Sequence, residues 1–251
     1  MGFIFFDDSK HPEAGFCLGA FVYLNNDPSD QIDEILRQQG LVPGVDEYKS
    51  RLPKNGAKAQ VVIREELRKM LALTASISVA VAPTAAELGA AGLALLEQML
   101  QHPTIRGADH IVAFDQGLFP SAPARSCAQS IGGLSSCTFH FEQDSRTARG
   151  IQLADLAAHT CAVMLKDALG LVTKTVKLGH AEGYEEGTEF ELGWDLWAGI
   201  RYGFLHGEAL DSADPAMVDS RPGLYVSPTA GERLRAAAFE CFGSLYLGCI
   251  H

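Results

Sequence analysis

The chain has 251 residues, of which 47% are hydrophobic and 20% are charged. It is therefore long enough and apolar enough to bury a sizeable core, as one large domain or as a domain with an extension. Its formal net charge of −11 argues against a broad basic surface for duplex DNA, because such binding depends on the neutralisation of phosphates. A local basic groove, or an acidic site that recruits cations, remains compatible with this charge.

Nothing in the sequence predicts a membrane segment or an exported protein. The longest apolar run falls short of the roughly 18 residues that a membrane span requires. The apolar start reaches Asp7 and Asp8 without a basic leader, which is not the pattern of a signal peptide. The six cysteines form no Cys-x-x-Cys pair, so we expect free thiols, a cytoplasmic location and no membrane partner.

In chain order, an initial hairpin is followed by alternating helices and strands. Residues 3–7 and 16–24 are apolar runs separated by a turn, which predicts an antiparallel pair of strands. Helical spacing of apolar residues follows at residues 27–39, 58–73, 84–102 and, after Asp144, up to Leu169. Further strands are expected at residues 76–82, 109–115 and 137–142. This alternation is typical of an α/β fold with a mixed central sheet flanked by helices.

From Gly170 onward the rhythm changes. Residues 179–191 and 207–222 are polar and predict loops, as does most of the stretch from 41 to 57. Helices are expected at residues 194–205 and 231–242, and a short strand at 223–227. We therefore divide the chain into a domain of residues 1–169 and a mostly helical C-terminal extension of residues 170–251 that packs on it.

Several apolar segments of the first domain end in carboxylates. These are Asp7 and Asp8, Asp115, and Asp144, and the last helix of the domain adds Asp155. Ligands of α/β sheets bind at the carboxyl ends of the strands, where several carboxylates cannot all ionise without cations. Hard oxygen ligands suit Mg²⁺ or Mn²⁺, and two such ions about 4 Å apart support phosphodiester cleavage.

Each acidic residue also has an ordinary structural interpretation. Asp7 and Asp8 would shape a turn, and Asp115 would cap the loop that follows it. Asp144 would be the N-cap of the next helix. Asp155 lies among apolar residues of that helix, so it would be a core carboxylate bonded to a backbone amide or an arginine. By the same argument, Glu47 and Lys49 on the polar stretch would be a solvated ion pair.

Three motifs carry a resemblance to a known family. They are Phe-Phe-Asp7-Asp8-Ser9, then Glu47-x-Lys49, and finally Asp144-Ser145 followed by Ile151-Gln-Leu-Ala-Asp155-Leu. They resemble the Asp-Glu-Ser-Gly opening, the internal Glu-x-Lys motif and the C-terminal signature of the family called domain of unknown function 3800. The resemblance extends over residues 3–168. It departs from the family pattern at Asp8, where the family has Glu, and at Lys10, where it has Gly.

The resemblance implies a ribonuclease-H-like fold, in which acidic residues of the first strand, a middle strand and the last core helix bind two divalent metals. By matching positions it implies Asp7, Asp115 and Asp155 as the ligands, with Asp115 matched by position rather than by motif. Further metal candidates on the same basis are Asp8, Glu47 and Asp144. The family itself is functionally uncharacterised, so its activity is inferred from fold.

The first functional hypothesis is a nuclease that uses Mg²⁺ or Mn²⁺ to hydrolyse RNA or DNA. Gln152 lies three residues before Asp155 on one helix face, and we expect it to orient Asp155 or a bound water. Lys49 would approach the scissile phosphate as a point charge. Arg146 and Arg149, expected on the first turn of that helix, would meet the nucleic-acid backbone.

The alternative is a non-catalytic interaction module that keeps the ribonuclease-H-like fold and binds partners through its extension. Residues 194–206 contain two tryptophans, a tyrosine and a phenylalanine at helical spacing. Such a stripe is more often core packing than a docking surface. Another class of phosphoryl-transfer enzyme lacks support, because the chain has no Gly-rich phosphate loop.

Overall fold

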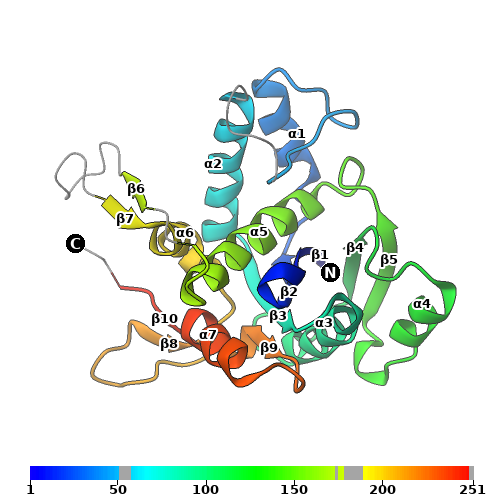
Figure 1. The fold of residues 1–251 in the computed structure, drawn as a ribbon. Coiled ribbons are helices and arrows are strands. Elements are labelled where there is room, and N and C mark those ends of the chain that lie inside the picture. The colour runs from blue at the N-terminus through cyan, green and yellow to red at the C-terminus, as the bar shows by residue number, and fades with distance from the viewer. Residues whose placement is uncertain (51–57, 173–174, 178–188, 249–251) are drawn as a thin grey trace.

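The computed structural model describes residues 1–50, 58–172, 175–177 and 189–248 (Figure 1). Six strands form a central sheet in the order β5-β4-β1-β2-β3-β9. Their bounds are β1 Gly2–His11, β2 Phe16–Leu24, β3 Ser76–Ala82, β4 His110–Asp115, β5 Cys137–Gln143 and β9 Leu224–Val226. Strand β2 is antiparallel to both of its neighbours, β1 and β3, whereas β4 is parallel to β1, β5 to β4, and β9 to β3. The predicted α/β fold with a mixed sheet is confirmed.

Helices cover both faces of this sheet. Their bounds are α1 Ser29–Gln38, α2 Lys58–Leu73, α3 Ala85–Leu100, α4 Ala122–Gln129, α5 Gly150–Ala168, α6 Leu192–Ile200 and α7 Glu232–Phe242. Helix α5 packs on β1 and β2 at the centre of the molecule, while α2, α6 and α7 contact α5 (Figure 1). Helix α3 packs on β2 and β3 from the opposite face, as the separation of the two core clusters shows. The result is a three-layer α/β arrangement.

Alternation along β1 decides which side chains meet α5. Phe5 belongs to the core cluster beneath α5, whereas Ile4 and Phe6 belong to the cluster beneath α3. Because successive side chains of a strand point to opposite faces, Asp7 lies on the α5 side and Asp8 on the α3 side. The two acidic residues that are neighbours in sequence are therefore separated by the sheet.

Helix α5 begins at Gly150 because the helix there lies against the ring of Phe5. A Cβ atom at position 150 would stand 2.3 Å from Cε2 of Phe5, far inside van der Waals contact. Glycine alone allows this close approach of helix to strand. The predicted start of the helix directly after Asp144 is therefore wrong, since residues 144–149 form a turn before the helix.

Strand β1 is longer than the apolar pattern predicts. It continues beyond Asp7 and Asp8 to His11, because β2 pairs with it along its whole length. Its parallel neighbour β4 pairs only as far as the step from Phe6 to Phe114. Asp7 and Asp8 thus lie inside a strand rather than in a turn, and Asp7 lies where the β4 side of the sheet ends.

The C-terminal extension contributes strands as well as helices. Strand β9 matches the predicted short strand and adds to the edge of the central sheet beside β3. Short strand pairs β6 Thr175–Lys177 with β7 Glu189–Glu191, and β8 Met217–Asp219 with β10 Ser244–Tyr246, were not predicted. Residues 51–57 and 178–188, which include parts of two predicted loops, lie outside the described residues.

Short 3₁₀ helices occur at Pro12–Ala14, Gly132–Leu134, Arg201–Gly203 and Arg221–Gly223. Helix α4 was also missed, because it occupies a stretch that reads as a polar loop and buries a single residue, Ala128. The five cysteines in the described part of the chain are free thiols. None of the helices in that part is long and apolar enough to cross a membrane.

Substituting Gly150 by alanine should destabilise the fold, because the added methyl group would collide with the Phe5 ring and push α5 away from β1. We expect a loss of about 1–3 kcal/mol in the free energy of unfolding, measured by denaturant titration. Gly132→Ala is the matched control, because its Cβ would meet no atom within 4 Å. A Gly150→Ala protein as stable as the control would contradict this packing.

Candidate functional site

Asp7 on β1 and Asp115 on β4 are neighbours across the sheet. The register Phe6↔Phe114 is the last pair of the two parallel strands, and the next residue on each strand is an aspartate. Ala113 and Phe5 both lie in the core beneath α5, so Asp115 faces α5 as Asp7 does. The two carboxyl groups are close enough that Asp115 raises the pKa of Asp7.

Asp155 reaches the same region from α5. Its Oδ2 accepts a hydrogen bond of 2.9 Å from the backbone N–H of Ser50, which fulfils the structural interpretation of this residue. It is also close enough to the strand carboxyls to act on them, because its charge raises the pKa of Asp7, and Asp115 raises that of Asp155. The structure therefore brings together the first-strand, middle-strand and last-helix carboxylates.

Burial and mutual repulsion make this cluster reluctant to ionise. Burial is the largest cause that raises the pKa of Asp7, to about 8, and Asp115 and Asp155 add to the effect. The N–H of Asp8, 2.6 Å from Oδ1 of Asp7, opposes it only in part. Burial also raises the pKa values of Asp115 and Asp155. At neutral pH the cluster therefore holds a proton, which reduces the repulsion between its carboxyl groups.

Lys49 is the cation nearest to the cluster among the described residues. Its Nζ lies 3.4 Å from the carboxylate of Glu47 and donates a hydrogen bond of 3.1 Å to Ser145 Oγ. Burial lowers the pKa of Lys49, but Glu47, Asp155 and Asp115 together raise it more. Glu47 and Lys49 are thus not a solvated pair on a loop. They form one wall of the acidic site, with Ser145 donating a hydrogen bond to Glu47.

Gln152 ties the walls of this site together. Its fully buried side chain accepts a 2.8 Å hydrogen bond from Tyr48 N–H and donates one of 2.9 Å to the carbonyl of Ser145. Gln152 is expected from the sequence to orient Asp155 or a bound water; among the described residues both polar ends of its amide bond to backbone rather than to Asp155, and the role toward a water stays a prediction. Gln152 acts on Asp155 indirectly, because it fixes the loop whose Ser50 N–H holds that carboxylate.

Asp144 closes a turn rather than capping a helix. Its Oδ1 accepts from Arg146 N–H at 2.8 Å, and the guanidinium of Arg146 bonds both of its oxygens. Arg146 holds the pKa of Asp144 at about 2. The prediction that Asp144 is the N-cap of this helix is wrong, because α5 starts at Gly150 with no side-chain cap. Asp144 lies near Lys49, at the edge of the site, with its charge already paired.

Three further candidates lie apart from the carboxylate cluster. Asp8, on the α3 side of β1, forms an ion pair of 2.9 Å with Lys10. Arg149 is almost buried and forms an ion pair of 2.5 Å with Asp33 of α1, so it anchors that helix. Arg146 is exposed but paired with Asp144. The placement of both arginines on the first turn of α5 is wrong, since both precede the helix.

The sequence interpretation missed Tyr48, Ser50 and Ser145 as parts of the site. Tyr48 is buried against the core beneath α5, and its N–H and that of Ser50 connect the Lys49 loop to α5. The alternation of buried Tyr48 with the polar residues beside it was the available signal. Ser145, also buried, links Glu47, Lys49 and Gln152.

The donor chemistry fits a hard divalent cation, because the convergent side chains are carboxylates whose repulsion a cation would relieve. Within the described ranges, however, no three His, Cys, Asp or Glu side chains are arranged closely enough to hold a metal ion together. The site is therefore compatible with a metal in its residue types, and side-chain rotation would be needed to complete a coordination shell.

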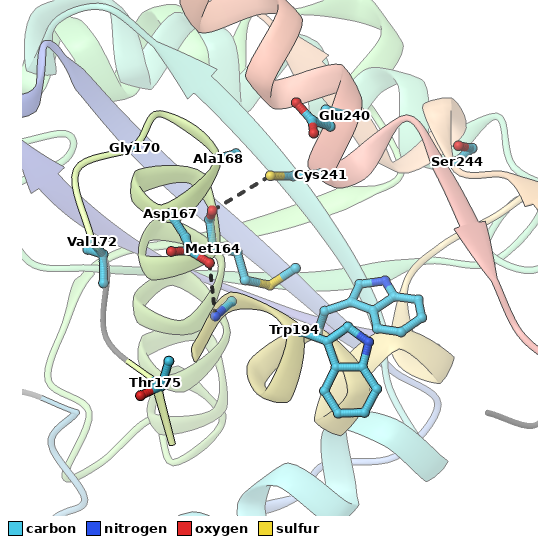
Figure 2. Close-up of a pocket in the computed structure, with 12 residues that line it drawn as sticks. Met164, Asp167, Ala168, Gly170, Val172, Thr175, Trp194, Glu240, Cys241 and Ser244 are labelled. Carbon is cyan, nitrogen blue, oxygen red and sulfur yellow. Dashed lines mark hydrogen bonds between the residues drawn. The ribbon is translucent and has the colours of Figure 1, made fainter. Parts of the chain in front are cut away.

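A separate cavity lies away from this cluster. It measures about 680 Å³ and is formed by α5, α6, α7 and the segment after α5 (Figure 2). Trp194 and Trp197 of α6 contribute to its wall, with Asp167 of α5 accepting a hydrogen bond from Gly193 N–H. Phe204 is buried in the core. The predicted aromatic stripe is thus divided between core packing and the wall of a cavity.

Comparison with known proteins adds no further identification. No model of a protein family matches the chain. A search of curated proteins found no matching relative. The resemblance to domain of unknown function 3800 stays a prediction that rests on the motifs themselves.

The raised pKa of Asp7 predicts how stability depends on pH. The folded protein keeps a proton on Asp7 up to about pH 8, whereas the unfolded chain releases it near the ordinary value of 3.8. Since the folded state binds the proton more tightly, the stability of the metal-free protein should fall as pH rises between these values. Asp7→Asn should remove this contribution and stabilise the protein at pH 8 by about 1–3 kcal/mol, measured by denaturant titration across pH.

Asp8→Asn is the control for this prediction, because Asp8 is on the opposite face of the same strand. It should change the pH dependence much less than Asp7→Asn does, because Asp8 adds less to the pKa of Asp7 than burial, Asp115 and Asp155 do. Identical pH profiles for Asp7→Asn and the unmodified protein would show that Asp7 is not the protonated group.

Gln152→Leu should loosen the Lys49 loop, since it leaves the buried N–H of Tyr48 and the carbonyl of Ser145 without their partner. The expected cost is about 2–4 kcal/mol, with faster hydrogen exchange at the amides of Tyr48 and Ser50. Gln38→Leu, at the exposed end of α1, is the control. Unchanged hydrogen exchange at both amides in Gln152→Leu would refute this role of Gln152.

Proposed function

We propose that the chain is a nuclease with a ribonuclease-H-like fold that uses Mg²⁺ or Mn²⁺ to hydrolyse phosphodiester bonds in RNA or DNA. The observation that carries this proposal is the convergence of Asp7 from β1, Asp115 from β4 and Asp155 from α5. It is the placement that the resemblance to domain of unknown function 3800 implies for the metal ligands. The free thiols among the described cysteines support a cytoplasmic location.

Asp7, Asp115 and Asp155 would hold the metal. A bound divalent ion would supply an activated water and stabilise the charge that develops on the leaving oxygen. Asp7 would give up its proton on metal binding, because the carboxylate form is the ligand. Asp155 is already held in place by the N–H of Ser50, which bonds one of its two oxygens. Glu47, whose carboxylate lies 3.4 Å from Lys49 Nζ, would be a further candidate ligand.

Lys49 would meet the phosphate. Its ammonium group is partly exposed, and carboxylates on more than one side keep it charged. The Tyr48–Gln152 and Ser50–Asp155 hydrogen bonds fix the backbone on both sides of it. A positive charge held in this way beside the acidic cluster is suited to stabilise the negative charge of a phosphodiester in the transition state.

A second candidate function is a non-catalytic interaction module of the same fold. The absence of a preassembled group of three ligands within the described ranges favours it. In this case Lys49 and the proton on Asp7 would be permanent counter-charges of a structural cluster. The two functions differ in one direct measurement, the binding of Mn²⁺ followed by titration calorimetry, which only the nuclease predicts at this site.

The nuclease is tested with labelled single strands, duplexes and RNA–DNA hybrids in the presence of Mn²⁺. We expect cleavage of at least one of these substrates, reduced about a hundredfold or more by Asp155→Asn and by Asp7→Asn. Lys49→Gln should reduce cleavage more than it reduces Mn²⁺ binding, because Lys49 acts on the phosphate. The loss follows from removal of groups that contact the metal or the reacting phosphate.

Asp219→Asn is the matched control, an aspartate paired with Arg221 in the C-terminal extension. It should cleave like the unmodified protein. The proposal fails if no substrate is cut, or if Asp155→Asn and Asp219→Asn cut equally well.

A further inference from the structure

Beside the acidic cluster lies a smaller cavity of about 180 Å³. Its walls come from α2, α5, α6 and the loop that carries Lys49. The charged residues that line it are Arg64 and Arg68 of α2 and Asp195 of α6, together with the titratable His159 of α5. The two guanidinium groups outnumber the single carboxylate that lines the cavity, although the chain as a whole has a net charge of −11.

This cavity is continuous in structure with the acidic site. His159 follows Asp155 by four residues on α5, so it lies on the same helix face, about 5.4 Å further along the axis. Ser50, whose N–H holds Asp155, also lines the cavity. Tyr48 is a third link, because both Asp155 and Arg64 act on its hydroxyl. A group in the cavity would be one helical turn from a group at Asp155.

The two arginines keep hydrogen-bond donors for a ligand. Arg64 donates through Nε to Glu65 at 3.2 Å, and Arg68 donates through Nη1 to the same carboxylate at 3.4 Å. Glu65 is largely exposed, so solvent screens these pairs. In the described part of the chain the terminal nitrogens of Arg64 have no hydrogen-bond partner, and a guanidinium has five N–H donors. Paired donors of this kind match phosphate oxygens.

We infer that this cavity binds the terminal phosphate of a nucleic-acid strand. The inference rests on the proposed nuclease function, and it means that the nuclease recognises the ends of strands. The volume of about 180 Å³ is below the range of about 300–1,000 Å³ for sites that hold drug-sized ligands, so a nucleoside does not fit. An internal phosphate of a strand would need room for a nucleoside on each side of it. A terminal phosphate needs room only for itself, and its charge of about −1.5 to −2 suits two guanidinium groups.

The test is the binding of short fluorescent single strands that carry a 5′-phosphate, a 3′-phosphate or only hydroxyl ends, followed by anisotropy. EDTA is present, so hydrolysis does not contribute. We expect one of the two phosphorylated strands to bind at least about tenfold more tightly than the hydroxyl strand. Arg64→Gln should abolish this difference. Arg64 is chosen because Arg68 also bonds the backbone of Asp195, so its loss would disturb α6.

Lys69→Gln is the matched control, an exposed residue of the same helix that pairs with Glu66 outside the cavity. It should keep the tenfold preference. Equal binding of all three strands, or an undiminished preference in Arg64→Gln, would overturn the inference. So would a nucleoside monophosphate that competes as well as the phosphorylated strand, since the ligand would then be a free nucleotide.

The outcome separates this inference from the proposed function. A preference for phosphorylated ends without cleavage in Mn²⁺ would support the cavity and reject the nuclease. Cleavage in Mn²⁺ without any preference for phosphorylated ends would support the nuclease and reject the cavity as a phosphate site.

Discussion

The structure around α5 depends on the burial of carboxyl groups that repel one another. Asp7, Asp115 and Asp155 come from three separate elements, and the fold buries Asp7 and leaves Asp115 and Asp155 partly buried beside it. A purely structural core would rarely keep such a cluster, because replacing it by apolar residues removes the cost of burial. A buried cluster with raised pKa values beside a lysine is the kind of arrangement that functional sites use.

The surrounding residues serve to hold that cluster in place. Gly150 lets α5 approach β1 closely enough for Asp155 to act on Asp7. Gln152 then fixes both the turn before α5 and the loop that carries Lys49. Each of these contacts joins segments distant in sequence, so the site is built by the packing of α5 against the sheet rather than by a single motif.

The carboxylates of the site could be predicted from the sequence, but the residues that surround and hold them could not. Asp7 and Asp115 could be placed at one edge of the sheet because both follow apolar strand residues, and Asp155 was added by the resemblance to domain of unknown function 3800. The start of α5 could not, since an apolar pattern does not distinguish a turn closed by Asp144 from the first turn of a helix. That Asp144 pairs locally is a matter of side-chain geometry.

Long-range packing explains the other differences. Strand β9 joins the sheet edge beside β3 through a pairing of residues more than a hundred positions apart, which no local pattern encodes. The hydrogen bonds of Gln152 are also non-local, and a buried amide can satisfy many backbone partners. The cavity lined by Arg64 and Arg68 exists only because α2, α5 and α6 meet there.

The central claim is that Asp7, Asp115 and Asp155 are metal ligands, and that their cluster is protonated in the protein without metal. The most direct measurement is a crystal structure of the protein soaked in Mn²⁺, with anomalous diffraction to locate the ion. The account predicts anomalous density in contact with carboxylate oxygens of Asp7, Asp115 and Asp155, and rotation of the side chains toward it. Anomalous density at other sites of the protein, with none at Asp7, Asp115 and Asp155, would contradict it.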